Sequence, residues 1–211
     1  SHHLNRVFTE RGARVLAGSL VKTLAPDDKG VTLITDQGES LRVDAVVAGL
    51  GIRPNTSLAE AAGLVTDNGI HVDAYLQTTH PAVYAAGDVA NFYNAVLDMR
   101  MRVEHEENAN LTGLLAGKGM AGQPEAYETL PSVYSALFDI TYDAVGDLNP
   151  AYPVIFDWQE PYQKGVLYYL REGRVRGVLL WNQGRGLDAA RALIAEAGPF
   201  TPDDLRGRIT G

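Results

Sequence analysis

The chain has no cysteine among its 211 residues. This absence excludes a disulfide framework, a thiolate metal site and a redox-active dithiol. No apolar run reaches the roughly 18 residues of a membrane span, and no signal peptide is visible. The 26 acidic residues outnumber the 18 lysines and arginines, and the resulting net charge of -8 argues against nucleic acid as the main partner. With 45% hydrophobic and 21% charged residues, the composition is that of an ordinary globular protein, which we expect to be cytoplasmic.

The first 54 residues contain a helical pattern followed by short strand patterns. Leu4 and Phe8 lie at helical spacing, so we expect a helix that ends near Gly12. Strands are expected at residues 14–17, 31–35, 41–43 and 46–48. The last of these, Val-Val-Ala, is typical of a fully buried strand and opens into a loop with two glycines, residues 49–54. Such a loop can admit a nucleotide phosphate or ribose, although paired glycines in α/β loops also have purely steric roles.

Residues 78–88, TTHPAVYAAGD, join a short apolar run to a small-residue turn that carries a carboxylate. The run from Val83 to Ala86 predicts a strand, because it is too short for a helix and turn signals bound it. Gly87 permits a close backbone approach, and Asp88 presents an acceptor at the carboxyl end of the strand, where ligands bind in open α/β sheets. An Asp-initiated turn explains the same residues equally well.

Residues 104–120 predict a helix whose acidic first turn complements the helix macrodipole. Ala109, Gly113 and Gly117 recur every four residues, so one face is nearly bare and can approach a sheet or another helix closely. The sequence Glu104-His105-Glu106 fits a solvated helix start better than a metal site, because no second cluster supplies further ligands. We therefore expect no metal site.

Three stretches, in order and spacing, resemble the later part of FAD-dependent pyridine nucleotide oxidoreductases. They are VVAGLGIRPN (46–55), GLVTDNGIHVDAYLQTTHPAVYAAGDVA (63–90) and RMRVEHEENANLTGLLAGKGMAG (100–122). The resemblance covers nearly the whole chain and implies an α/β class: a partial two-dinucleotide-binding-domain flavoprotein fold with FAD and NAD(P)H as cofactors. YAAGD is similar to the second flavin motif, which implies that Gly87 and Asp88 bind the ribitol-pyrophosphate arm of FAD. GLGIRPN resembles the motif that joins the NAD(P)-binding and FAD-binding parts, which implies cofactor contacts for Gly51 and Pro54.

Within that family, the chain is most similar to the branch of apoptosis-inducing-factor-like proteins and ferredoxin reductases of oxygenase systems. RVEHEENA resembles the start of the helix that faces the flavin. Carried over, Glu104 and His105 lie near the isoalloxazine and the incoming nicotinamide. PSVYSALFDITYDAVGDL resembles the family's FWSDQYD stretch, with Tyr134 in place of the aromatic beside the flavin. Ala136 stands in place of an aspartate, and this departure leaves the electron acceptor open.

The resemblance divides the chain into three parts. Residues 1–54 end the NAD(P)-binding domain, 55–127 form the second segment of the FAD-binding domain, and 128–211 form an α+β C-terminal domain, often called the dimerisation or interface domain. In the third part, Glu172-Gly173 predicts a tight turn between two apolar strands, and a helix is expected to begin at Asp188. Four aromatics are interpreted as core and interface residues rather than a cofactor box: Trp158, Tyr168, Tyr169 and Trp181. We expect a homodimer.

The Gly-x-Gly-x-x-Gly turns that bind FAD and NAD(P)H phosphates in this family do not occur here. The chain therefore resembles the last half of a longer enzyme and is expected to be inactive alone. In the complete enzyme we expect hydride to pass from nicotinamide to flavin, and electrons to pass to an iron-sulfur protein, a quinone-like molecule or oxygen. No catalytic acid or nucleophile is expected, because the protein's part is positioning and electrostatics. The alternative is a non-catalytic C-terminal fragment that acts as a dimerisation or interaction module without a bound cofactor.

Overall fold

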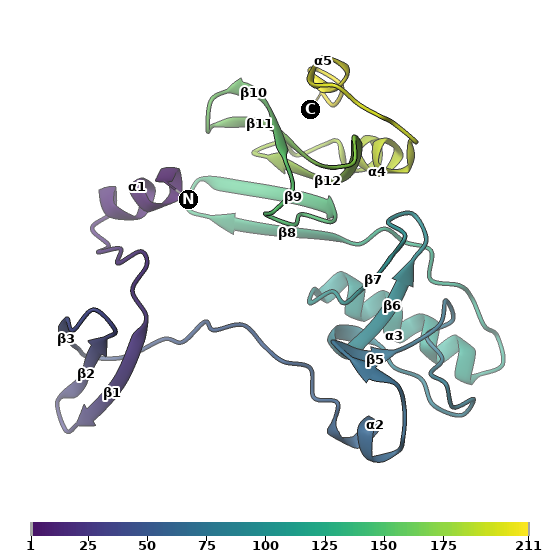
Figure 1. The fold of residues 1–211 in the computed structure, drawn as a ribbon, viewed down its shortest axis with the longest axis horizontal. Helices are drawn as coiled ribbons and strands as arrows, with labels where there is room; N and C mark the ends of the chain where they lie inside the picture. Colours follow the sequence, from purple (N-terminus) through teal and green to yellow (C-terminus); the bar gives the residue numbers. More distant parts are fainter. Residues whose placement is uncertain (1, 211) are drawn as a thin grey trace. The chain divides into compact units, whose positions relative to one another are not determined.

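The computed structural model describes residues 2–210 of the chain. They form two compact units, Ser1–Ile52 and Arg53–Gly211 (Figure 1). The first unit contains a three-stranded sheet, and the second contains a four-stranded and a five-stranded sheet. Within residues 2–210, no helix combines the length and apolar character needed to cross a membrane.

The first unit consists of a helix and an antiparallel meander. Its elements are α1 (His2–Glu10), β1 (Val21–Asp27), β2 (Gly30–Thr35) and β3 (Ser40–Val43). The predicted N-terminal helix and the strands expected at 31–35 and 41–43 are confirmed. The turn between β1 and β2 needs a glycine, because Gly30 has φ +138° and a Cβ there would lie 2.4 Å from the carbonyl oxygen of Val43.

Two strands predicted in this unit do not form. Residues 14–17 have no strand structure, because the β1–β2 turn pairs Val21 with Thr35 and so gives residues 21–27 the place beside β2. Residues 46–48 are also not a strand, and Val47 is 99% exposed. A buried strand needs neighbours that satisfy its backbone and cover its faces, and no described strand pairs with residues 46–48.

The second unit begins with a short helix and the four-stranded sheet. Its elements are α2 (Ser57–Ala61), β4 (Thr66–Asp67), β5 (Gly69–His71), β6 (Ala90–Asn94) and β7 (Met99–Met101), in the sheet order β4-β5-β6-β7. The predicted Asn68-Gly69 turn joins β4 to β5. β5 and β6 are parallel, so the chain must cross over between them, and residues 72–89 make this connection.

Helix α3 (Glu106–Met120) confirms the helix predicted at 104–120 and packs on the core of this sheet. Its buried residues fall at positions i, i+4, i+7 and i+8 and so form one face: Asn108, Thr112, Leu115 and Ala116. The predicted bare face makes a close approach at Ala109, whose Cβ would lie 3.6 Å from a Cβ added at Gly87. At Gly113 and Gly117 an added Cβ would meet no atom within 4 Å, so this part of the face is open in the second unit.

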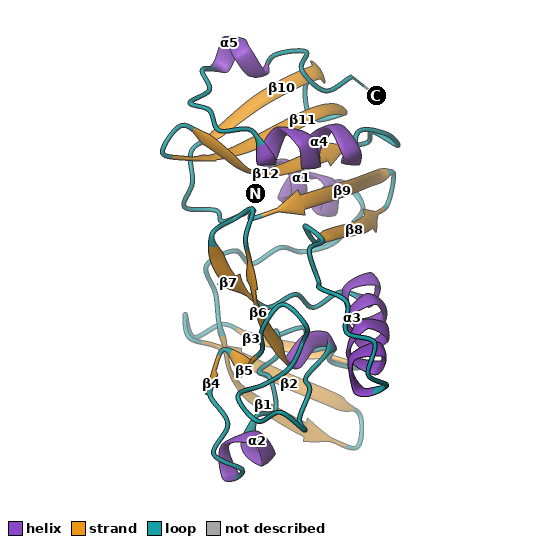
Figure 2. Ribbon diagram, turned by 90° about the vertical axis from the view of Figure 1, so that its right-hand side faces the viewer, coloured by secondary structure: helices purple, strands orange, loops and turns teal. Residues whose placement is uncertain are grey.

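The C-terminal part is an antiparallel five-stranded sheet with two helices. Its elements are β8 (Ser132–Leu137), β9 (Ile140–Gly146), β10 (Val154–Glu160), β11 (Lys164–Arg171), β12 (Arg174–Trp181), α4 (Leu187–Ala195) and α5 (Pro202–Leu205), with strand order β10-β11-β12-β9-β8. α4 packs against β12 and β9 (Figure 2). Glu172 and Gly173 both have positive φ, which confirms the predicted tight turn.

The core of this sheet follows the alternation of its strands. Val166, Tyr168 and Leu170 on β11 are buried on the face that α4 covers. The turn between β6 and β7 adds Leu97, which is fully buried in the same core. This insertion attaches the four-stranded sheet to the C-terminal sheet.

Candidate functional site

The segment before Gly87 is extended but is not a strand. The predicted strand at 83–86 was wrong: only Tyr84 forms a bridge, to Gln77. Backbone bonds from Thr78 to Val83 and from Ala85 to Leu76 hold the segment against residues 76–78. The run is too short, and its neighbour turns away too soon, for a regular ladder to form.

Gly87 reverses the chain and joins it to α3. Its φ is +68°, and it begins a one-turn 3-10 helix, η1 (Gly87–Val89), that contains Asp88. The Gly87 N–H donates to the hydroxyl of Thr112 at 2.9 Å, and this hydroxyl donates to the carbonyl of Asn108 at 2.6 Å. Thr112 is fully buried, so the bond fixes the Asp88 turn against the second turn of the helix.

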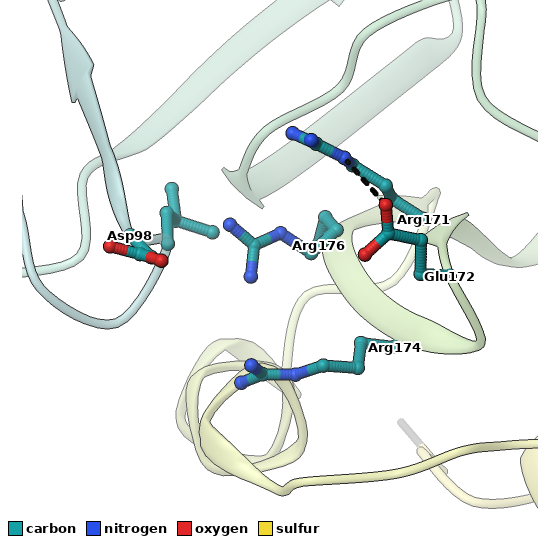
Figure 3. Close-up of a pocket in the computed structure, with 6 residues that line it drawn as sticks. Asp98, Arg171, Glu172, Arg174 and Arg176 are labelled. Atoms are coloured by element: carbon teal, nitrogen blue, oxygen red, sulfur yellow. Dashed lines mark ion pairs between the residues drawn. The ribbon is translucent and has the colours of Figure 1, made fainter.

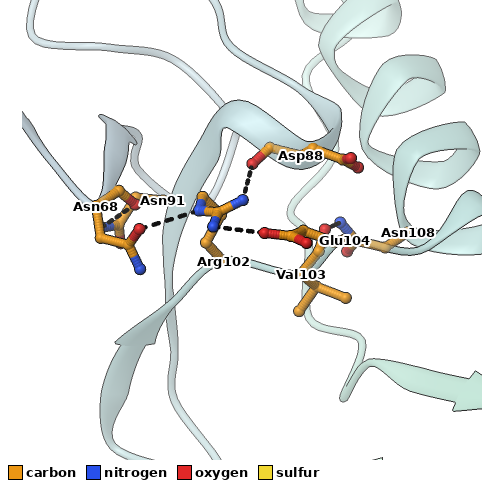
Figure 4. A network of polar contacts seen from close by, with 7 residues as sticks. All are labelled: Asn68, Asp88, Asn91, Arg102, Val103, Glu104 and Asn108. Carbon is orange, nitrogen blue, oxygen red and sulfur yellow. Dashed lines mark hydrogen bonds and ion pairs between the residues drawn. The ribbon is translucent and has the colours of Figure 1, made fainter. Parts of the chain in front are cut away.

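Arg102 holds the other side of the turn. Its guanidinium donates to the Asp88 carbonyl at 2.8 Å, to Asn68 Oδ1 at 3.2 Å and to Glu104 Oε1 at 2.6 Å (Figure 4). The Arg102 side chain is only 9% exposed. With its backbone held in this way, the Asp88 carboxylate lies on the α3 side of the turn, is exposed, and accepts no hydrogen bond from the described residues. It is therefore available to a ligand.

The N-terminus of α3 lies next to this turn. His105 is its N-cap, and no side chain there accepts from the first-turn N–H groups. The His105 ring meets the Tyr134 ring edge-on, with centroids 4.8 Å apart and planes at 82°. His105 Nε2 accepts from the Tyr134 N–H at 3.5 Å, while the buried Nδ1 has no partner. Tyr134 itself is 55% exposed.

Asn108 connects this helix start to the core. Its Nδ2 donates to the Val103 carbonyl at 3.2 Å, and its Oδ1 accepts from the Tyr127 hydroxyl at 2.8 Å. Burial raises the pKa of Tyr127 to about 12, so this hydroxyl is a proton donor at all physiological pH values. The bond fixes the first turn of α3 from its buried side.

The structure gathers five of the seven predicted cofactor residues into one region of the second unit: Gly87, Asp88, Glu104, His105 and Tyr134. Glu104 lies before the helix rather than in it and pairs with Arg102. Gly51 and Pro54 lie in the linking segment without regular structure, and the contacts of the site do not include them. Among residues 2–210, no group of His, Asp and Glu side chains has the arrangement of a metal site.

Arg102 and Thr112 were missed by the sequence analysis. Arg102 and Glu104 are two residues apart in an extended segment, so their side chains share a side, and this spacing is the signal that could have paired them. Thr112 carried no such signal, because its partner Gly87 lies 25 residues away in sequence.

Comparisons with known proteins identify the family of the chain. Residues 1–113 match the pyridine nucleotide-disulphide oxidoreductase family, and residues 156–196 match the C-terminal domain of mitochondrion-associated apoptosis-inducing factor. The chain is 31% identical, over 99% of its length, to the ferredoxin–NAD(+) reductase component of an anthranilate 1,2-dioxygenase system from Burkholderia cepacia, of which it covers 52%. It is 32% identical, over 91% of its length, to apoptosis-inducing factor 1 of Dictyostelium discoideum, of which it covers 40%.

The chain is also similar to solved structures of ferredoxin reductases. The ferredoxin reductase of the CYP199A2 system from Rhodopseudomonas palustris superposes with a TM-score of 0.83 at 26% identity, over 96% of this chain and 50% of that one. The reductase in a covalent putidaredoxin reductase–putidaredoxin complex gives 0.82 at 29% identity, over 96% of this chain and 48% of that one. The chain thus spans about half the length of these relatives. The match confirms the predicted α/β class with a C-terminal sheet domain, and the chain belongs to the pyridine nucleotide-disulphide oxidoreductase family, in the branch of apoptosis-inducing factors and ferredoxin reductases.

Proposed function

We propose that this chain is the C-terminal half of an FAD-dependent NAD(P)H oxidoreductase, and that Asp88 and the N-terminus of α3 hold the flavin. The observation that carries the proposal is the exposed, unpaired Asp88 carboxylate on a turn that Thr112 and Arg102 hold in place. The Asp88 carboxylate adds no hydrogen bond to the turn that carries it, so its fixed position serves a ligand better than it serves the stability of the turn.

The donors and acceptors of the site fit a flavin. The Asp88 carboxylate can accept hydrogen bonds from ribitol hydroxyls. The first-turn N–H groups of α3, which lack a side-chain cap, can donate to the pyrimidine side of the ring, and the helix dipole favours the negative charge that reduction adds there. The unpaired Nδ1 of His105 offers one more polar atom at the same end of the helix. When bound, the flavin supplies the acceptor of hydride from NAD(P)H.

The electron acceptor belongs to the same proposal. Of the three predicted acceptors, an iron-sulfur protein has the most support, because one relative is the ferredoxin–NAD(+) reductase component of a dioxygenase system. Another is a reductase captured in a complex with putidaredoxin. Reduction of a ferredoxin by NADH or NADPH, measured with the complete protein, tests this part separately from flavin binding.

The flavin test compares Asp88→Ala with Asp88→Asn in the complete, flavin-loaded protein. A charge-assisted hydrogen bond is worth about 1.5–3 kcal/mol, so Asp88→Ala is expected to weaken FAD binding about 10- to 100-fold. Asp88→Asn should cost less, because its amide oxygen still accepts. Asp67→Asn, at an exposed position on β4, is the matched control and should leave flavin affinity unchanged.

The stability of the flavin-free protein separates this role from a structural one. Asp88 is exposed and its side chain holds nothing in the second unit, so both variants should stay within about 0.5 kcal/mol of the parent without flavin. Loss of stability without flavin, together with unchanged FAD affinity, would contradict the proposal. A colourless complete protein that takes up no FAD would favour the non-catalytic interaction module instead.

A further inference from the structure

A cavity of about 140 Å³ lies between the β6–β7 turn and the β11–β12 hairpin. It is lined by Leu97, Asp98, Arg171, Glu172, Arg174 and Arg176, none of which belongs to the Asp88 site. Figure 3 shows the guanidinium groups of Arg174 and Arg176 extending to the same side of β12, with that of Arg176 directed toward Asp98. The cavity therefore has three arginines and two carboxylates on its wall; Arg171 is paired with Glu172, and Asp98 lies opposite Arg176.

Arg176 is buried without a counter-charge. The residue is 6% exposed, and its Nε has no hydrogen-bond partner. The Nε of Arg174 is likewise buried and unpaired, and neither side chain forms an ion pair or hydrogen bond within residues 2–210. The carboxylates nearby have other contacts: Glu172 lies 3.9 Å from Arg171, and Asp98 accepts from the Tyr93 hydroxyl.

A buried guanidinium has few ways to lower its energy. Arginine stays charged in proteins, so it cannot give up its proton as a buried lysine does. A buried charge is strongly unfavourable unless it is paired and hydrogen-bonded. Two guanidinium groups on the wall of one cavity suit an oxyanion, which accepts several N–H bonds at once. We propose that this cavity is a binding site for a phosphate group.

The size and rim of the cavity favour phosphate among the oxyanions. Its volume is roughly ten times the ~10–15 Å³ needed for one water, which suits a small group. Asp98 and Glu172 on the lining repel an anion that has no proton. A phosphate oxygen that keeps a proton can donate to Asp98, whereas sulfate and acetate cannot do so near pH 7. The carboxylates thus favour hydrogen phosphate, which keeps a proton near pH 7; a monoester, whose second pKa is about 6, keeps its proton only at lower pH.

The binding test uses the full chain and calorimetric titration with inorganic phosphate, glycerol phosphate, sulfate and acetate, at ionic strength held constant with chloride. Phosphate is expected to bind at least about 10-fold more tightly than sulfate or acetate, as one lost charge-assisted hydrogen bond predicts. Tighter binding of glycerol phosphate than of inorganic phosphate assigns the site to an organic monoester, and the reverse assigns it to the free ion. Equal binding of phosphate, sulfate and acetate, or no binding above chloride, overturns the proposal.

Variants identify the cavity as the site. Arg176→Met keeps the length of the side chain and removes its charge, and it should raise the phosphate dissociation constant about 10- to 100-fold. It should not lower the midpoint of urea unfolding without phosphate, because it removes an unpaired buried charge. Arg174→Gln, at a less buried position, gives the same test if Arg176→Met does not fold. The control is Arg206→Gln, because the Arg206 side chain is 65% exposed and paired with Asp203. An equal loss of phosphate binding in this variant overturns the assignment.

Discussion

Replacing Thr112 by valine tests whether α3 fixes the Asp88 turn. Thr112 is fully buried, and its hydroxyl is the acceptor of the Gly87 N–H at 2.9 Å. Valine has the same shape and a similar helix propensity, so the packing of α3 should hardly change. The Gly87 N–H would lose its acceptor inside the protein, which costs about 1–3 kcal/mol. We therefore expect Thr112→Val to lower the free energy of unfolding by that amount.

The measurement must report on α3 rather than on the C-terminal sheet. Both tryptophans, Trp158 and Trp181, lie in that sheet, so their fluorescence follows the wrong region. Hydrogen exchange of the Gly87 amide reports on the turn and its helix, and far-UV circular dichroism during urea unfolding follows the described helices together, of which α3 is the longest. Thr112→Ser is the matched control, because it keeps the hydroxyl and should retain most of the Gly87 protection. Unchanged Gly87 exchange in Thr112→Val, or equal loss in both variants, would refute the role given to this bond.

Two further predictions concern the core and the first unit. Burial raises the pKa of Tyr127 from 10.0 to about 12, so the unfolded chain loses this proton first and the free energy of unfolding should fall as the pH rises from about 10 to 12. Tyr127→Phe should reduce that fall, measured by urea unfolding at each pH, whereas Tyr75→Phe at an exposed position should leave it unchanged. Gly30→Ala should destabilise the β1–β3 meander by more than the roughly 1–2 kcal/mol of a left-handed residue, because its Cβ would meet the Val43 carbonyl. Gly38→Ala, also at positive φ but with open space, should cost only the backbone term, and equal hydrogen exchange in β3 of the two variants would show that the clash is relieved.

Elements with a complete local pattern were predicted from the sequence. α1, α3, β2 and the β11–β12 turn each carry their signal within a few residues: helical spacing, alternation or a Glu-Gly turn. Residues 46–48 and 83–86 have equally apolar sequences but do not become strands. A strand is defined by its partner, and the partner is set by register and chain position rather than by the residues of the strand itself.

In the candidate site, the sequence predicted some of the residues but not the bonds that hold them in place. The resemblance of YAAGD and RVEHEENA to flavoprotein motifs predicted roles for Asp88 and His105. In the structure His105 is the N-cap of α3, and Asp88 lies in η1, which packs against this helix. The bonds that hold Asp88 in place could not be predicted, because they join residues far apart in sequence through a hydroxyl and a guanidinium. Thr112 in a helix and Arg102 in an extended segment are ordinary residues until the fold brings Gly87 and Asp88 to them.

The burial of Arg176 in the arginine cavity could not be predicted from the sequence of its own strand. Arg174 and Arg176 alternate with Val175 along β12, and this spacing alone predicts a charged, solvated face of a strand. The face is closed instead by the β6–β7 turn, which buries Leu97 in the C-terminal core and brings Asp98 to the arginines. Because this turn comes from a different sheet, neither segment alone shows that Arg176 will be buried. A guanidinium that is solvated in the isolated strand belongs to a residue that is 6% exposed in the folded unit, with a buried Nε that has no partner, and this change of environment is the basis of the proposed affinity for an oxyanion.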